Sequence, residues 1–572
     1  MSPSALRTAR LAVLALVVAM ACESVPATAR PSPTPGEEPR RGGRLVEGSF
    51  TDVKTLNPML ANDVASATVT GRIYDGLVYA DPRSGDPKPN LATWTVAADG
   101  LTYGWQVQPG AAWSDGRPIV GADFLEVVRA SARSKKTLRK TNFQMIEGFE
   151  EYSAGKSRTI TGIRLSGSDP KAFTVRFTKV WCAAVTTAFG IAPIPAHVFG
   201  KYTVDDDVGR NLDEAPENLA PTVASGPFKL KDWRKGDQLV LDRNDTYFKG
   251  APFVDQYVFK IVADVTALSS QLRSGEINFG AIEPKDYADI SRRQELQILR
   301  FQQLGYTGIG WNTRSQTASA LQDKRVRQAL AYGLDVDGFV KTALFGQGAK
   351  MVQHHPQIYW AAAPSASLES YRYEPAKAEE LIRSAGYQRG ADDYYAREGK
   401  PLSVTIVTNQ GNKVRETLLQ SASDQYKQIG VRVNARLEPF DATVDKLSTG
   451  AADVEAWIIG WSLGIDPDPY SIWHSSQIPD AAKRTTGFNF SRFTTPGLDK
   501  AISDGRTPAD KDCGMAARQR SYEAFNKILN DEQPYEFGFS QFTLLTVPAK
   551  LRGPQPGPFA VYWNIEKWWF AP

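Results

Sequence analysis

The chain has 572 residues, of which 42% are hydrophobic and 23% are charged, and its formal net charge is +4 at pH 7. These proportions are ordinary for a soluble globular protein, and the length suggests about three domain-sized units. A net charge this small, without a block of Lys and Arg, excludes a nucleic-acid binder that acts through charge.

The first residues of the chain have the pattern of an export signal. An apolar run from Leu11 to Ala21 follows two arginines without any acid and ends directly before Cys22. The run fits the core of a signal peptide and falls short of the roughly 18 residues that a permanent membrane span needs. A small residue before a cysteine resembles the bacterial lipobox, which implies removal of residues 1–21 and lipidation of Cys22. An ordinary secretory signal with a nearby cysteine is the alternative.

Residues 22–42 are rich in Pro, Ser, Thr and charged residues and contain only isolated apolar ones. Such a segment cannot bury enough apolar surface to offset the entropy lost on ordering, so we expect a mobile tether. Together with the lipidated cysteine, this tether would hold a folded body outside the cytoplasm, at the outer face of the cell membrane. The lipid anchor would be the only membrane contact.

The rest of the chain alternates between segments with strand and helix patterns. Polar and apolar residues alternate in the first kind, which predicts half-buried strands, and apolar residues recur at helical spacing in the second. The strand-like segments are Gly43–Gly48, Leu239–Arg243 and Val404–Thr408, and the helical ones are Asp323–Tyr332, Ala376–Ser384 and Thr417–Ile429. This alternation predicts an α/β fold that binds its ligand at a cleft between domains.

Motifs for catalysis are scarce in this chain. The zinc-binding pattern H-E-x-x-H does not occur. Ser153 and Lys156 satisfy S-x-x-K, but their Gly- and Ser-containing surroundings predict a solvated turn. The adjacent His354 and His355 would face opposite sides of an extended chain, so we interpret them as a loop pair rather than a metal site. We therefore expect no catalytic residue, no metal and no cofactor.

Cys182 and Cys513 are the remaining cysteines besides Cys22. An exported protein can pair such residues in a disulfide. Two buried thiols are equally compatible with their distant positions, and the sequence leaves both alternatives open.

Four longer segments carry motifs that occur together in one known family. Asn90–Phe124 contains two Asp-Gly turn dipeptides among tryptophans, and Val223–Gly275 begins with an Ala-Ser-Gly-Pro-Phe element. Asp323–Leu330 reads DKRVRQAL, and Gly460–Tyr470 reads GWSLGIDPDPY. Their order resembles that in the bacterial extracellular solute-binding proteins of family 5, which serve peptide and nickel ABC importers. The resemblance extends over roughly residues 43–545.

This resemblance implies a two-lobed α/β fold of the periplasmic-binding-protein type (type II, with an extra subdomain), with mixed sheets, flanking helices and a hinge. Lobe I would comprise residues 43–57, 195–305 and 489–572. The extra subdomain would comprise residues 58–194, and lobe II residues 306–488. The chain would cross between the lobes, and form the hinge, near Tyr306–Trp311 and Phe488–Phe490.

The Gly460–Tyr470 segment is the expected ligand-binding loop. In typical peptide binders of the family, an Asp about three residues after the Trp pairs with the ligand's α-amino group. This chain has Gly464 there, followed by Asp466 and Asp468. Either carboxylate is a candidate for the ammonium partner, and the alternative is that both cap backbone N–H groups of a proline-containing turn.

Side chains near this loop are further candidates for ligand contacts. Trp461, Tyr470 and Trp473 are candidate walls for ligand side chains or sugar rings. Arg415 follows a predicted strand and is a candidate partner for a ligand carboxylate, with a solvated surface position as the alternative.

The function implied by the resemblance is that of a monomeric lipoprotein that captures oligopeptides and delivers them unchanged to an ABC permease with a cytoplasmic ATPase. Ligand that bridges both lobes would stabilise their closed arrangement. An oligosaccharide binder of the same fold is one alternative. A different class, an exported serine hydrolase, would require Ser153 and Lys156 in a buried cleft.

Overall fold

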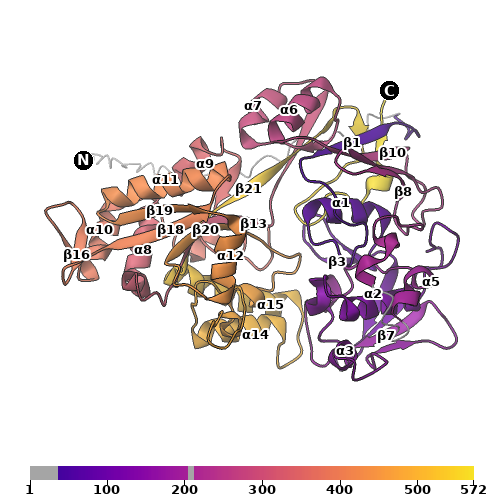
Figure 1. Ribbon diagram of the computed structural model, residues 1–572, viewed down its shortest axis with the longest axis horizontal. Coiled ribbons are helices and arrows are strands. Elements are labelled where there is room, and N and C mark those ends of the chain that lie inside the picture. Colours follow the sequence, from indigo (N-terminus) through magenta and orange to yellow (C-terminus); the bar gives the residue numbers. More distant parts are fainter. Residues whose placement is uncertain (1–36, 204–211) are drawn as a thin grey trace, which may run out of the picture.

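The computed structural model describes residues 37–203 and 212–572, which form two lobes side by side (Figure 1). The first lobe contains residues 37–203, 212–302 and 549–572, and the second contains residues 305–539. The predicted signal peptide, Cys22 and most of the predicted tether lie outside the described residues. The α/β architecture expected from the sequence is confirmed.

A four-stranded mixed sheet forms the centre of the first lobe. Its order is β1 (Arg44–Ser49), β10 (Gln256–Ile261), β9 (Gln238–Arg243) and β8 (Phe228–Arg234), with β1 parallel to β10. Leu45, Tyr257 and Leu241 are register partners on adjacent strands and therefore share one buried face. Helix α1 (Val64–Ile73) contributes Val69 to the same core.

The extra subdomain is built on a second, antiparallel sheet within the first lobe. Its strands are β4 (Ala92–Val96), β5 (Thr102–Val107), β7 (Ala172–Arg176) and β6 (Ile163–Leu165), in that spatial order. Helix α2 (Gly121–Arg133) covers one face, where the Phe124 ring stacks 5.4 Å from that of Phe173. Gly100 adopts a φ of +70° in the turn between β4 and β5, as expected for an Asp-Gly dipeptide.

The second lobe surrounds a larger mixed sheet. Strands β13 (Gly305–Trp311), β20 (Ala456–Ser462), β18 (Ser403–Asn409) and β19 (Arg432–Glu438) lie side by side in this order. Helices α8 (Lys324–Tyr332), α10 (Pro375–Ser384) and α11 (Lys413–Gln428) pack around it. Asp323 caps α8 by accepting a hydrogen bond from the Arg325 N–H, so this helix begins where the sequence predicted it.

Long strands connect the two lobes. Strand β21 (Tyr535–Pro548) pairs at its start with β13 and at its end with β12 (Leu296–Gln302) and β11 (Gly280–Ala281). The yellow ribbon of β21 runs from one lobe to the other in Figure 1. The first expected crossing, Tyr306–Trp311, lies in β13, next to this connection.

The second expected crossing between the lobes, at Phe488–Phe490, is not the place where the chain returns to the first lobe. Phe490, Leu498 and Phe525 share a core with Trp457, so the apolar faces of α14 (Pro496–Arg506) and α15 (Met515–Glu532) are buried in the second lobe. The chain returns to the first lobe only along β21, and the residues from β22 (Leu551–Arg552) onward pack there.

Candidate functional site

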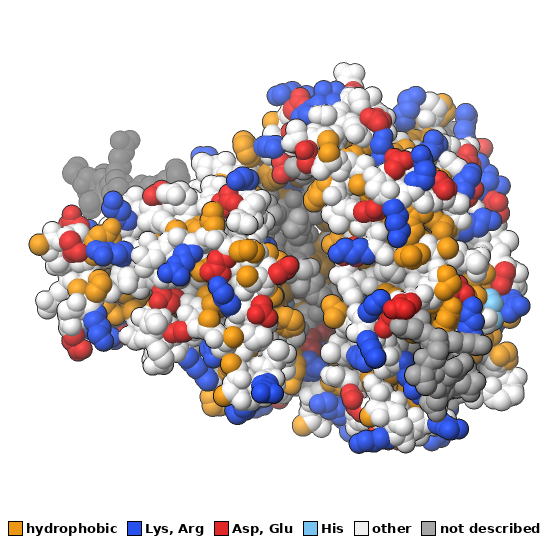
Figure 2. Space-filling model, viewed as in Figure 1, with side chains coloured by type: hydrophobic (Ala, Val, Ile, Leu, Met, Phe, Trp, Pro, Cys, Tyr) orange, Lys and Arg blue, Asp and Glu red, His pale blue; other side chains and the backbone are white. Residues whose placement is uncertain are grey.

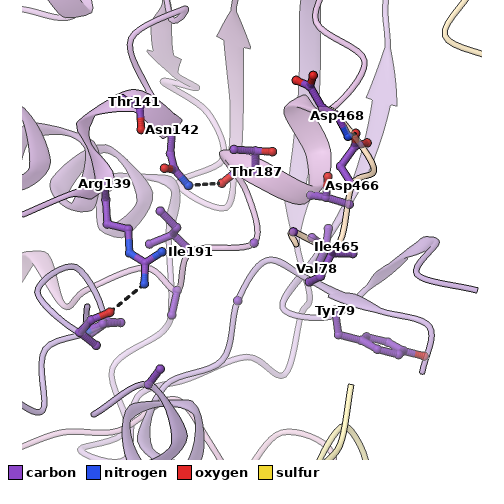
Figure 3. A pocket seen from close by; sticks show the side chains of 18 of the residues that line it. Val78, Tyr79, Arg139, Thr141, Asn142, Thr187, Ile191, Ile465, Asp466 and Asp468 are labelled. Atoms are coloured by element: carbon purple, nitrogen blue, oxygen red, sulfur yellow. Dashed lines mark hydrogen bonds between the residues drawn. The ribbon is translucent and has the colours of Figure 1, made fainter. Parts of the chain in front are cut away.

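The two lobes enclose a cavity of about 840 Å³. Figure 2 shows the molecular surface hollowed along the boundary between the lobes. The first lobe contributes the end of α1 and the segments around Asp75, Asn90, Arg139 and Ile191, and the second lobe contributes the loop after β20 together with Phe488 and Arg506. Figure 3 shows Arg139 and Asn142 on one side of the cavity and Ile465, Asp466 and Asp468 on the other.

The loop between β20 and α13 (Tyr470–Trp473) is shaped by its two aspartates. Asp466 Oδ1 accepts a hydrogen bond of 3.0 Å from the Asp468 N–H, and Asp468 Oδ1 accepts one of 3.0 Å from the Tyr470 N–H. Each side chain therefore forms an Asx turn two residues long, which holds the Asp-Pro-Asp-Pro backbone in place. The capping role considered for these carboxylates is present in the structure.

Asp466 is also paired with a buried arginine. Arg518 of α15 donates two hydrogen bonds to its carboxylate, of 2.9 Å and 2.6 Å, and both side chains are at most 10% exposed. Burial lowers the pKa of Arg518, but the adjacent Asp466 carboxylate outweighs this effect and the pKa is raised. The pair thus carries no net charge toward the cavity.

Asp468 is paired in the same way with Arg506 of α14, whose Nη1 donates to Oδ2 over 2.9 Å. Burial raises the pKa of Asp468, and Arg506 opposes that rise. The Arg506 guanidinium also lies 4.0 Å from the centre of the Tyr470 ring, which lines the cavity. Both loop carboxylates are therefore already matched by guanidinium groups, and their expected role as ammonium partners stays a prediction.

The two candidate tryptophans lie behind the cavity wall. The ring centre of Trp461 lies 6.3 Å from that of Phe488, which lines the cavity. The Trp461 Nε1–H donates a hydrogen bond to the Tyr535 hydroxyl. Trp473 is 0% exposed and donates its Nε1–H to His354 Nδ1 over 3.0 Å. In this structure Trp473 is a core residue, because the helical turn of α13 directs its side chain into the second lobe.

Arg415 lies near the N-terminus of α11, outside the set of cavity residues. Its Nη1 donates to Asn409 Oδ1 over 2.7 Å, at the carboxyl end of β18, and burial lowers the pKa of the guanidinium. A ligand carboxylate at Arg415 stays a prediction.

Three polar residues of the first-lobe wall were not found from the sequence. Asp75 and Asn90 line the cavity beside the connection that follows α1, and Arg139 lines it from the extra subdomain. Arg139 Nη2 donates to the Ala61 carbonyl over 2.7 Å, and its Nε is buried without a hydrogen-bond partner in the described part of the chain. No local motif marks these residues, because the folding of distant segments brings them together.

Cys182 and Cys513 form a disulfide, with 5.2 Å between their Cα atoms. The sequence left this pairing open. Trp181 and Arg506 line opposite walls of the cavity, and the Cys182 N–H donates to the Arg506 carbonyl over 3.0 Å. The bond therefore connects the two lobes beside the cavity.

The residues of the hydrolase alternative do not form a cleft. Ser153 donates its hydroxyl hydrogen to the Ala132 carbonyl, and Lys156 is exposed in the turn that follows α3 (Phe149–Ser153). His354 and His355 do lie in a loop, where both are buried, and burial lowers the pKa of His355 to about 4. Within residues 37–203 and 212–572, no cluster of His, Cys, Asp and Glu has the arrangement of a metal site. No helix in these ranges combines the length and apolar character of a membrane span.

Comparisons with known proteins agree on one protein family. The model of the bacterial extracellular solute-binding proteins, family 5 (middle region), matches residues 86–481. The oligopeptide-binding protein AppA of Bacillus subtilis (strain 168) is 28% identical over 537 residues, which cover 93% of each chain. The structure of AppA from Bacillus subtilis in complex with a nonapeptide has a TM-score of 0.73 and covers 94% of this chain and 100% of that one.

The fold is also shared with more distant proteins. NikZ from Campylobacter jejuni, solved in complex with Ni(L-His), is 23% identical, with a TM-score of 0.72 over 92% of this chain and 99% of its own. The lactococcal OppA, solved with an endogenous peptide in the closed conformation, is 20% identical, with a TM-score of 0.73 over 92% of this chain and 99% of its own. These likenesses confirm the two-lobed α/β fold of periplasmic binding proteins.

Proposed function

This chain belongs to the bacterial extracellular solute-binding proteins of family 5, and on that premise we propose that it captures peptides between its lobes and delivers them unchanged to an ABC importer. The main support is the 840 Å³ cavity, whose two walls come from different lobes. A ligand that contacts both walls stabilises the closed arrangement by its differential affinity for it. A shift of the equilibrium from 1:99 to 99:1 needs about 5.5 kcal/mol of differential affinity, and the total binding free energy of a micromolar ligand, about 8 kcal/mol at standard state, is large enough to contain it.

Peptide is the proposed ligand class because AppA of Bacillus subtilis, which is similar over nearly its whole length, is named as an oligopeptide-binding protein. The cavity is compatible with this class: it offers apolar surface from Ile191, Ile465 and Phe488 beside the charged Arg139 and Asp75. Peptide backbones and termini need such polar partners, and their side chains need apolar walls. The loop 464–470 forms the second-lobe wall, and contacts from Trp461 or Arg415 would require a ligand that extends beyond this cavity.

The proposal includes anchoring at the cell surface. After removal of residues 1–21, the lipidated Cys22 would hold the monomeric protein on the outer face of the membrane, next to the permease and its cytoplasmic ATPase. Mass spectrometry of the membrane-extracted protein tests this step: the mature chain should begin at Cys22 and carry the mass of a diacylglyceryl group. A Cys22→Ser variant should be released from the membrane, whereas retention of that variant would contradict the anchor.

Binding is tested by native mass spectrometry of protein purified without denaturation, before and after incubation with an equimolar pool of random pentapeptides. We expect peptide-bound ions whose peptides are recovered with unchanged masses. Recovery of glycans alone would favour the oligosaccharide alternative, and shortened peptides would contradict a pure binding function. Failure to capture any peptide from the pool would overturn the proposed ligand class.

A further inference from the structure

The cavity contains three carboxylates, and they differ in their charge partners. Asp466 and Asp468 each receive a hydrogen bond from a guanidinium, whereas Asp75 has no ion pair among the described residues. Asp75 belongs to the first lobe, in the connection between α1 and β2 (Val78–Ala80). Among the described residues, it is therefore the carboxylate of this cavity that no cationic side chain contacts directly.

The backbone and side chain of Asp75 are both held in position. Its N–H donates to the Ser225 hydroxyl over 3.0 Å, and its Oδ2 accepts a hydrogen bond of 2.6 Å from the Tyr247 hydroxyl. Burial raises the pKa of Asp75, while the charge of Lys249 and the hydrogen bonds from Tyr247 and Asn90 oppose that rise. Lys249 itself lies against the rings of Tyr79 and Phe248, 5.5 Å and 5.4 Å from their centres.

Asn90 supplies a second, independent sign of a missing partner. The residue is 5% exposed and lines the cavity, and its Nδ2 donates to the Gly76 carbonyl over 3.0 Å. Its Oδ1 is buried and accepts no hydrogen bond from any residue that the structure describes. A buried amide oxygen without a donor is costly, so a ligand that brings a donor to this point gains the corresponding free energy.

We propose that Asp75 and Asn90 bind a primary ammonium group of the ligand. An ammonium carries three N–H donors and one positive charge, which match a carboxylate and an adjacent neutral acceptor. The first lobe, rather than the Asp466–Asp468 loop of the second, then recognises the charged amine. This assignment rests on the proposed peptide-binding function and adds which end or side chain of the peptide is recognised.

Two sources supply this chemistry in a peptide: the α-amino group and a lysine side chain. Three pools of random pentapeptides separate them: free N-termini without Lys, acetylated N-termini without Lys, and acetylated N-termini with one Lys. Their affinities are compared by competition in native mass spectrometry. We expect the wild type to bind one of the two amine-bearing pools about tenfold or more tightly than the amine-free pool. The pool that is favoured identifies the source.

The Asp75→Asn variant keeps the shape of the side chain and should lose this preference. Asp245→Asn is the matched control, because it removes an equal charge at an exposed position outside the cavity. A preference that survives in Asp75→Asn, or that disappears in Asp466→Asn or Asp468→Asn instead, overturns the assignment. Equal binding of all three pools by the wild type overturns it as well.

A wild type that captures none of the three pools contradicts the proposed peptide function itself, so the two failures are distinguishable. If Asp75→Asn does not fold, a crystal structure of the wild type with a peptide from the favoured pool decides. The ammonium nitrogen should then lie within hydrogen-bonding distance of Asp75 and Asn90 Oδ1. An ammonium seated on the second lobe would reject the assignment.

Discussion

Cys182 and Cys513 are joined across the boundary between the two lobes, although 331 positions separate them in the chain. Cys182 follows Trp181 of the first-lobe wall, and Cys513 lies between α14 and α15 of the second lobe. On the same rim, the Lys511 side chain approaches Gly100 of the extra subdomain. A covalent bond at this position restrains the separation of the walls.

Removing the Cys182–Cys513 disulfide is expected to let the two lobes separate more easily. A disulfide that closes so long a loop contributes about 2–5 kcal/mol to stability. Cys182→Ser and Cys513→Ser should therefore unfold at a lower temperature than the oxidised wild type and should release bound peptide faster. Calorimetry and dissociation kinetics measure both effects. The two variants should agree with each other and with the reduced wild type, and an unchanged release rate would show that the bond does not restrain opening.

The Asp468–Arg506 pair is expected to stabilise the cavity loop. Asp468→Asn leaves a guanidinium that is only 14% exposed without its carboxylate, which costs about 3–5 kcal/mol. The double variant Asp468→Asn/Arg506→Gln removes both charges and should recover part of that loss. Denaturant unfolding of the wild type, the single variants and the double variant gives the coupling energy. Full additivity of the single effects would contradict a structural pair.

Burial of His355 makes the free energy of unfolding depend on pH at acidic pH. The imidazole Nε2–H donates a hydrogen bond of 2.8 Å to the Pro467 carbonyl of the cavity loop, and burial lowers the pKa of His355 from 6.5 to about 4. The unfolded chain therefore binds a proton at a higher pH than the folded protein. This contribution to stability is complete above pH 6.5 and decreases by about 3 kcal/mol as the pH falls toward 4. Urea unfolding at several pH values should show a smaller decrease for His355→Gln than for the surface variant His197→Gln.

Glu536 has the opposite effect on the pH dependence. Burial raises the pKa of this carboxyl group in β21 from 4.5 to about 7, and Lys350 opposes the rise. The folded protein therefore holds a proton that the unfolded chain has lost, and stability decreases as the pH rises from 4.5 to 7, by about 3 kcal/mol. Glu536→Gln should be more stable than the wild type at pH 8 and about equally stable at pH 4. Equal stability of the two proteins at pH 8 would contradict a raised pKa of Glu536.

The elements with a strong local signal were predictable. The helix after Asp323 and the strand at Val404–Thr408 are present because hydrophobic period and capping chemistry act over a few residues. Asp466, Asp468 and Tyr470 of the expected ligand-binding loop line the cavity, and their role in binding stays a prediction. Trp473, by contrast, lies in the core, because an aromatic residue beside a binding loop is compatible with either environment.

The sequence by itself determined the class of this protein: the alternation of strand and helix patterns, together with ordered motifs over most of the chain, identified the two-lobed α/β fold and the family. Only the tertiary structure decided which charges in the cavity are free. Arg518 lies 52 positions from Asp466 and Arg506 lies 38 positions from Asp468, so these pairings have no local signature in the sequence. The return of the chain along β21 and the Cys182–Cys513 bond were decided in the same way, because both depend on contacts between distant segments that form only when the two lobes pack.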